Sequence, residues 1–165
     1  MGDGTKEYST NKWEVITLTE DRTAYIYGEN TQGWAECYFS VYGLSAYPFA
    51  QIEFEWIKEG LSKVAINEGQ KKYLQSLTNR TLPGYRWWDM AAIERHTKGK
   101  KKAKVWLVEI KTHQISIETI KSLQETGKMP SEEQIVYEKS LGFGHLIISV
   151  QLVTRRQVGV SCQEI

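Results

Sequence analysis

The chain has 165 residues, 41% of them hydrophobic and 25% charged, and 21 Lys and Arg balance 20 Asp and Glu. These fractions are those of one globular domain, and they argue against disorder, collagen and coiled coil. With no run approaching 18 apolar residues and no apolar leader, neither a membrane helix nor a signal peptide is expected. Two cysteines without a CxxC pair favour a reducing, cytoplasmic setting, although the pairing of Cys37 with Cys162 stays open.

The N-terminal part is rich in aromatic and β-branched residues. Short runs of them fill residues 13–42 and are separated by Gly, Asn and Asp clusters. This pattern is typical of an antiparallel β meander. We therefore predict a first domain over residues 1–48, which either forms its own subdomain or extends a larger sheet.

The rest of the chain alternates helical and strand patterns. Apolar residues recur at helical spacing over 49–78, with a break expected near Gly60 and again near 67–69. The remaining predicted elements are two strands at 85–93 and 104–111, helices at 115–126 and from 130 to Gly142, and a buried strand at 145–153. We predict a second domain over 49–165, an α+β arrangement with a mixed central sheet flanked by helices.

Charge is divided unevenly along the chain. Residues 1–70 hold 5 Lys and Arg against 11 Asp and Glu, a net −6, and residues 71–165 hold 16 against 9, a net +7. Basic clusters suit nucleic-acid phosphates, although a Lys-rich hairpin tip also protects a sheet edge. The candidate phosphate-binding residues are Lys98, Lys100, Lys101, Lys102, Arg155 and Arg156.

Two acidic residues are expected to meet in the predicted hairpin. Glu109-Ile110-Lys111 ends an apolar run, and a turn centred near Gly99 places Asp89 opposite Glu109. Opposed carboxylates repel each other, and a shared cation removes the repulsion. A slip of one residue in the hairpin would move Asp89 to the other face, so the prediction depends on the register.

This set of side chains suits metal-assisted hydrolysis of a phosphodiester. Asp89 and Glu109, with the Ile110 carbonyl, offer the oxygen ligands that Mg²⁺ prefers, with Mn²⁺ as a substitute. Such an ion lowers the pKa of a bound water, and Lys111 would orient that water or stabilise the anionic transition state. The plainer interpretation is an acid at a strand end, paired with a Lys for solubility.

The segments 88–93 and 105–111 resemble the core of the PD-(D/E)xK nucleases, a superfamily that includes type II restriction enzymes, Holliday junction resolvases and RecB-like nucleases. The resemblance implies a restriction endonuclease-like fold: a helix, a three-strand meander, a helix and a further strand. It also implies a Mg²⁺-dependent endonuclease acting on DNA, with Asp89, Glu109 and Lys111 in the active site. Trp88 departs from the pattern, because the family often has Pro before the Asp.

The resemblance leaves two points open. A Glu from the preceding helix often completes the metal shell, and we favour Glu68 over Glu53, Glu55 and Glu59. Cutting both strands of a duplex usually takes two sites, which predicts a homodimer. The alternatives are a non-catalytic α+β module that binds protein or nucleic acid, and a nuclease fold without activity.

Overall fold

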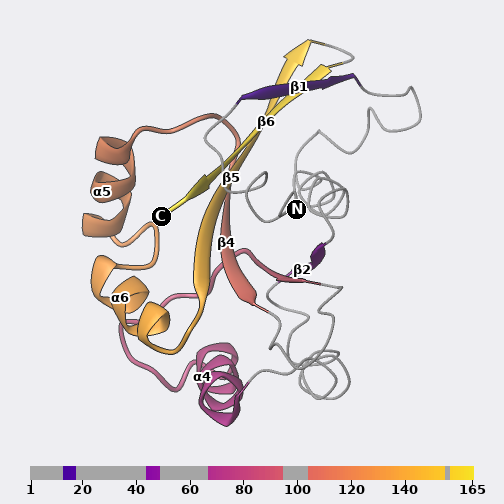
Figure 1. Cartoon of the computed structure of the whole chain (residues 1–165). Coiled ribbons are helices and arrows are strands. Elements are labelled where there is room, and N and C mark those ends of the chain that lie inside the picture. The colour runs from indigo at the N-terminus through magenta and orange to yellow at the C-terminus, as the bar shows by residue number, and fades with distance from the viewer. Residues whose placement is uncertain (1–12, 18–43, 49–66, 95–103, 155–156) are drawn as a thin grey trace.

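The computed structural model describes residues 13–17, 44–48, 67–94, 104–154 and 157–165. The elements in these ranges are β1 (Glu14–Thr17), β2 (Leu44–Pro48), α4 (Glu68–Thr78), β3 (Met90–Glu94), β4 (Val105–Lys111), α5 (Ile117–Glu125), α6 (Glu132–Ser140), β5 (Gly144–Thr154) and β6 (Gln157–Glu164) (Figure 1). Strands and helices are mixed along the chain, which confirms the predicted α+β class. None of the helices in these ranges has the length and apolar character needed to cross a bilayer.

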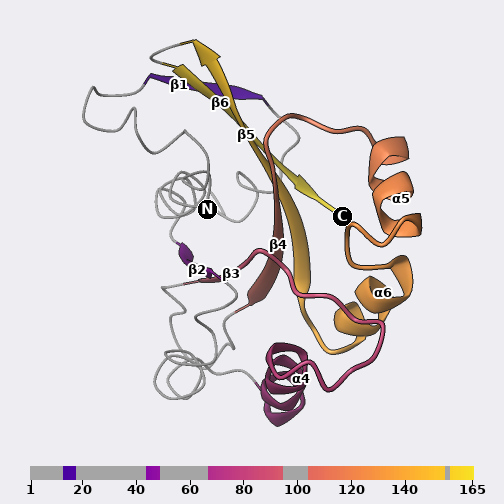
Figure 2. The ribbon, with the colours of Figure 1, turned by 180° about the vertical axis from the view of Figure 1, so that it is seen from behind.

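The strands form one six-stranded sheet in the order β1-β6-β5-β4-β3-β2. Only the pair β4 and β5 is parallel, and the other neighbours are antiparallel. A parallel pair needs a long crossover connection, and here α5 and α6 supply it. Figures 1 and 2 show α5 and α6 on the same side of the sheet, with α4 near the end at which β5 begins.

The hairpin of β3 and β4 has the predicted register. Met90 pairs with Val108, and Ile93 pairs with Val105, so the paired residue numbers sum to the value expected for a turn centred at Gly99. The tip of the hairpin lies outside the described residues. The register places Asp89, just before β3, beside Glu109.

The two described strands of the N-terminal region extend the larger sheet. β1 pairs with β6 at one edge, and β2 pairs with β3 at the other. The ring of Trp13, just before β1, lies so close to Gly159 that a Cβ there would overlap it. The proposed boundary at residue 48 stays a prediction, because most of 1–48 lies outside the described residues.

The strands of the C-terminal part differ from the prediction in two respects. The first hairpin strand begins at Met90 and not at Tyr85. The backbone N–H and C=O of Arg86 form hydrogen bonds with the Gln134 side chain instead of with a neighbouring strand. A further strand, β6, follows β5 and was not predicted. Its residues from Val158 to Cys162 are all buried, so this part of β6 is covered on both faces.

Capping residues explain where the helices begin. Asn67 caps α4 in a reciprocal pair with Gln70, and Ser116 and Ser131 cap α5 and α6. The end of α6 precedes Gly142, whose φ of 97° suits glycine. The helices predicted at 115–126 and from 130 to Gly142 are thereby confirmed within one or two residues at most boundaries. The described part of 49–78 is α4, and 49–66 lies outside.

The main core cluster lies where α4 and α6 face the sheet. It is built on large apolar side chains that are almost fully buried: Tyr73, Leu74, Leu77, Trp88, Val105, Leu107, Ile135 and Phe143. A second cluster forms under α5 around Ile120, Met129 and Ile147. Cys162 is a buried free thiol on β6. The two clusters hold the crossover helices in place and so fix the ends of β3 and β4.

Candidate metal centre

Asp89, Glu109 and Lys111 come together at the start of β3 and the end of β4. Glu109 and Lys111 are two residues apart on one strand, so their side chains lie on the same face of the sheet. The Glu109 side chain is nearly buried, with 6% of the residue exposed, and Lys111 is partly exposed. A buried acid at the end of an apolar strand needs compensation for the water it has lost.

Asp89 is oriented by the backbone of β4. Its Oδ2 accepts a hydrogen bond of 2.8 Å from the Ile110 N–H. The β3–β4 ladder ends at the pair of Met90 and Val108, so Asp89 continues the connection between the strands through its side chain. This bond holds the carboxylate beside Glu109.

Glu109 is held between a cation and an anion. The Lys111 Nζ lies 3.2 Å from its Oε2. Burial, and then the negative charge of Asp89, raise the pKa of Glu109 to about 8, although Lys111 acts in the opposite direction. Lys111 alone therefore does not compensate the two carboxylates, and the raised pKa favours the protonated form of Glu109.

The donor set fits a hard divalent cation. Mg²⁺ is bound by one or two carboxylates together with several waters, and Asp89 and Glu109 supply two carboxylates. Burial and then the negative charge of Asp89 raise the pKa of Glu109, and a bound cation would act in the opposite direction by favouring its charged form. Over the described ranges, no three His, Cys, Asp or Glu side chains gather in one place. The part of the chain described thus offers a site of two carboxylates.

The structure does not bring Glu68 to these acids. Glu68 is exposed in the first turn of α4, and Gln70, in the same turn, lies against Gly142, just before β5. Glu109 pairs with Ile147, three residues into β5. The alternatives Glu53, Glu55 and Glu59 lie outside the described residues. So do all six predicted phosphate-binding residues: Lys98, Lys100, Lys101, Lys102, Arg155 and Arg156.

A second buried acid, Glu138, forms the centre of a hydrogen-bonded cluster that was not predicted. Glu138 of α6 is fully buried, and its carboxylate accepts hydrogen bonds from four side chains. The Trp88 indole N–H lies 3.0 and 3.1 Å from its two oxygens, and the His145 Nε2 lies 2.9 Å from Oε1. The remaining donors are the Tyr73 hydroxyl and the Gln134 amide, which lies 3.1 Å from Oε2.

Gln134 links this cluster to the chain that leads to Asp89. Its amide oxygen accepts from the Arg86 N–H and its amide nitrogen donates to the Arg86 carbonyl, both at 2.8 Å. The sequence carried a signal for one pair of this cluster only. Gln134 and Glu138 are four residues apart, on the face of α6 that also carries the buried Ile135. Polar residues on the buried face of a helix indicate a hydrogen-bonded network.

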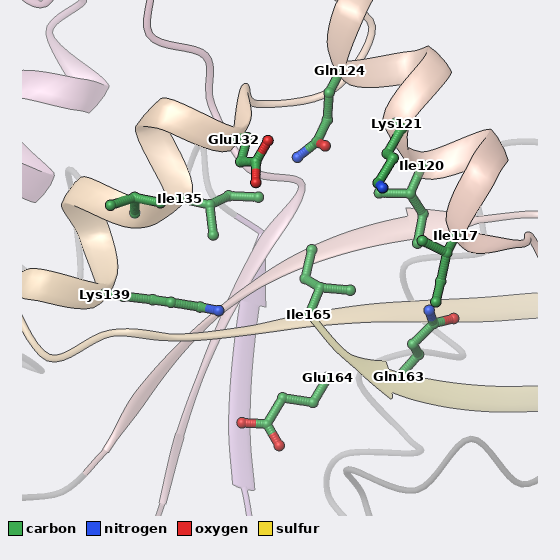
Figure 3. A pocket seen from close by; sticks show the side chains of 11 residues that line it. Ile117, Ile120, Lys121, Gln124, Glu132, Ile135, Lys139, Gln163, Glu164 and Ile165 are labelled. Atoms are coloured by element: carbon green, nitrogen blue, oxygen red, sulfur yellow. The ribbon is translucent and has the colours of Figure 1, made fainter.

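A groove between α5, α6 and the C-terminal end of β6 has a volume of about 300 Å³. Figure 3 shows Ile117, Ile120 and Ile135 turned toward Ile165 in this groove, with Lys121 and Lys139 at its sides. Neither Asp89 nor Glu109 lines it. The groove is therefore separate from the candidate metal centre.

Comparison with protein-family models, with curated proteins and with solved structures finds no match to this chain.

Proposed function

We propose that the protein is a Mg²⁺-dependent endonuclease that hydrolyses DNA phosphodiester bonds, with a restriction endonuclease-like core. The observation that carries the proposal is the meeting of Asp89 and Glu109 at the end of a buried strand, with Lys111 on the second carboxylate. Phosphodiester hydrolysis needs ligands for a metal ion and a positive charge near the phosphate. Two acids that lack a second positive charge would supply the ligands, and the partly exposed lysine beside them would supply the charge. A solubility pair at a strand end would have no reason to be buried.

The order of the elements supports this core. β2, β3 and β4 are consecutive antiparallel strands, and the crossover through α5 and α6 returns the chain to β5, parallel to β4. The resemblance implies the same meander, helix and further strand. One difference stands out, because α4 is inserted between β2 and β3. The meander is thereby split after its first strand.

The chain's own residues take distinct roles in this proposal. Asp89 and Glu109 hold the ion, with the Ile110 carbonyl as a further ligand, and Mn²⁺ can replace Mg²⁺. When bound, such an ion would neutralise phosphoryl charge and lower the pKa of a water. The Ile110 N–H keeps Asp89 oriented, and Lys111 places a positive charge next to the attacked phosphate. Basic residues of the hairpin tip bind the DNA backbone, and a homodimer supplies one site for each strand.

A cleavage assay tests the proposal. The protein is incubated with supercoiled plasmid and with single-stranded, branched and flapped oligonucleotides, in Mg²⁺, in Mn²⁺ and in EDTA. We expect cutting only with metal, and a loss of about 100-fold or more in Glu109→Ala and Lys111→Ala. The exposed Glu164→Ala serves as the matched control and should cut like the wild type. Equal cutting by all four proteins would overturn the assignment. Absence of cutting by the wild type on every substrate would favour a binding module or an inactive nuclease fold.

A further inference from the structure

The segment that precedes Asp89 is held by helix side chains instead of by a neighbouring strand. Within the described part of the chain no strand pairs with residues 85–88, and β3 begins only at Met90. Arg86 is bonded on both its N–H and its C=O by Gln134, and Trp88 is bonded through its indole by Glu138. Two consecutive turns of α6 thus fix the chain on the side from which it enters Asp89.

Asp89 and Trp88 are neighbours that point into different environments. In extended chain, successive side chains point to opposite sides. Trp88 is turned into the core, where its ring also lies 5.1 Å from that of His145, and Asp89 is turned toward the end of β4. Any rotation of the Trp88 backbone would therefore move the Asp89 carboxylate relative to the Ile110 N–H.

The Glu138 cluster is well suited to fix an orientation. Its four donors come from α4, from the segment before β3, from α6 itself and from β5. Burial, and then the charge of Glu138, raise the pKa of Tyr73, so its hydroxyl keeps its proton and remains a donor. Apolar side chains of the same volume often stabilise a core at least as well as a buried charge does, but they do not impose directions on their neighbours.

We propose that Glu138 and Gln134 are positioning residues for the metal centre. They hold Arg86 and Trp88 so that the Asp89 carboxylate stays on the Ile110 N–H and faces Glu109. The hydrogen bond between Asp89 and the Ile110 N–H is present in the structure, whereas its consequence for metal binding rests on the proposed function. The position of Asp89 and the binding of Mg²⁺ are therefore tested in separate experiments.

The first test follows the Ile110 amide by hydrogen exchange with NMR detection. Its partner is the Asp89 carboxylate, so its protection reports on the position of that carboxylate. In Trp88→Phe and in Gln134→Leu we expect its exchange to become at least about tenfold faster relative to the amides of β5, such as Ile148. Asp89→Ala gives the exchange rate of the fully released amide.

A matched control separates positioning from loss of stability. Ile120→Val removes a methyl group from the second core cluster, away from the Glu138 network. Denaturant is added to bring its unfolding free energy to that of the network variants. In this Ile120→Val control, the Ile110 amide should then keep its protection from hydrogen exchange relative to the amides of β5. Equal acceleration of Ile110 and β5 in Trp88→Phe and Gln134→Leu would overturn the inference. If Trp88→Phe does not fold, Gln134→Leu and Glu138→Gln carry the test.

The second test measures Mg²⁺ binding to the same full-length proteins by isothermal titration calorimetry. Residues that orient a metal ligand typically change metal affinity by 10- to 100-fold when they are replaced. We expect the Kd for Mg²⁺ to rise about tenfold in Gln134→Leu and in Trp88→Phe, and to stay unchanged in Ile120→Val. An unchanged Kd in the network variants would overturn the positioning role. A wild type without Mg²⁺ binding would refute the proposed function, and the exchange result would still decide whether Asp89 is positioned by α6.

Discussion

The two carboxylate clusters differ in how completely their charges are compensated. Glu138 is fully buried and accepts from four donors. Glu109 is almost as buried, yet it has one lysine partner and faces another carboxylate, so its pKa rises to about 8. A compensated buried acid fixes neighbouring groups, whereas an uncompensated pair provides a site for a cation.

The clusters are connected along the chain by the peptide bond between Trp88 and Asp89. They are also connected through the sheet, where His145 of β5 pairs with Leu107, two residues before Glu109.

The largest effect is expected from Glu138→Ala. The change leaves the indole of Trp88 and the other donors unpaired in the core, which costs about 3–5 kcal/mol of unfolding free energy. Urea denaturation followed by circular dichroism measures the loss. Lys139→Ala, an exposed change on the same helix, should stay within about 0.5 kcal/mol of the wild type. A loss no larger than that of the control would mean that the buried cluster contributes little to the fold.

The pH dependence of stability distinguishes Glu109 from an ordinary acid. Because its pKa is raised in the folded protein, the folded state binds this proton more tightly than the unfolded chain does. The contribution is fully present below about pH 4.5 and is lost as the pH rises through about 8. Relative to Glu109→Gln, the unfolding free energy of the wild type should therefore fall, at most by about 1.4 kcal/mol per pH unit.

Parallel urea titrations of both proteins between pH 5 and pH 9 measure this difference. Glu164→Gln, at an exposed position of β6, is the control and should follow the wild type at every pH. A constant difference between the wild type and Glu109→Gln would show that Glu109 titrates normally.

Binding of Mg²⁺ should raise the unfolding free energy of the wild type by less than Glu138→Ala lowers it. At about 100 times its Kd, a ligand that binds only the folded state adds about 2.7 kcal/mol, which corresponds to roughly 5–10 °C for a chain of this size. The ion competes with the Glu109 proton, so the rise in Tm should be larger at pH 8.5 than at pH 6.5. Differential scanning calorimetry measures it, and Asp89→Asn should abolish it. A rise that persists in Asp89→Asn would place the ion elsewhere.

The hairpin could be predicted because its evidence is local. The strand patterns around Gly99 fix both the register and the meeting of Asp89 with Glu109, and the structure has the pairs that follow from them. The metal-binding role of these residues stays a prediction. β6 was missed, although the alternation of Val158, Val160 and Cys162 was readable in the sequence.

The Glu138 cluster could not be derived in the same way, because its partners are far apart in the chain. Trp88 precedes Glu138 by 50 positions, and Tyr73 precedes it by 65. No periodic pattern links such positions, since the packing of α6 against α4 and the sheet brings them together. The prediction that Glu68 joins the two acids is wrong for a similar reason, because tertiary packing sets the position of a helix relative to the end of a strand.

The edge strand β1 has a consequence for the order of folding. Thr17 pairs with Gln157, 140 positions further along the chain, and Trp13 covers Gly159 on the same strand. During synthesis this edge cannot be completed until β6 has emerged from the ribosome, whereas the β3–β4 hairpin can close much earlier. Assembly of the two acids can thus precede completion of the sheet, and among the described strands β1 closes the longest loop, which has the largest entropic cost.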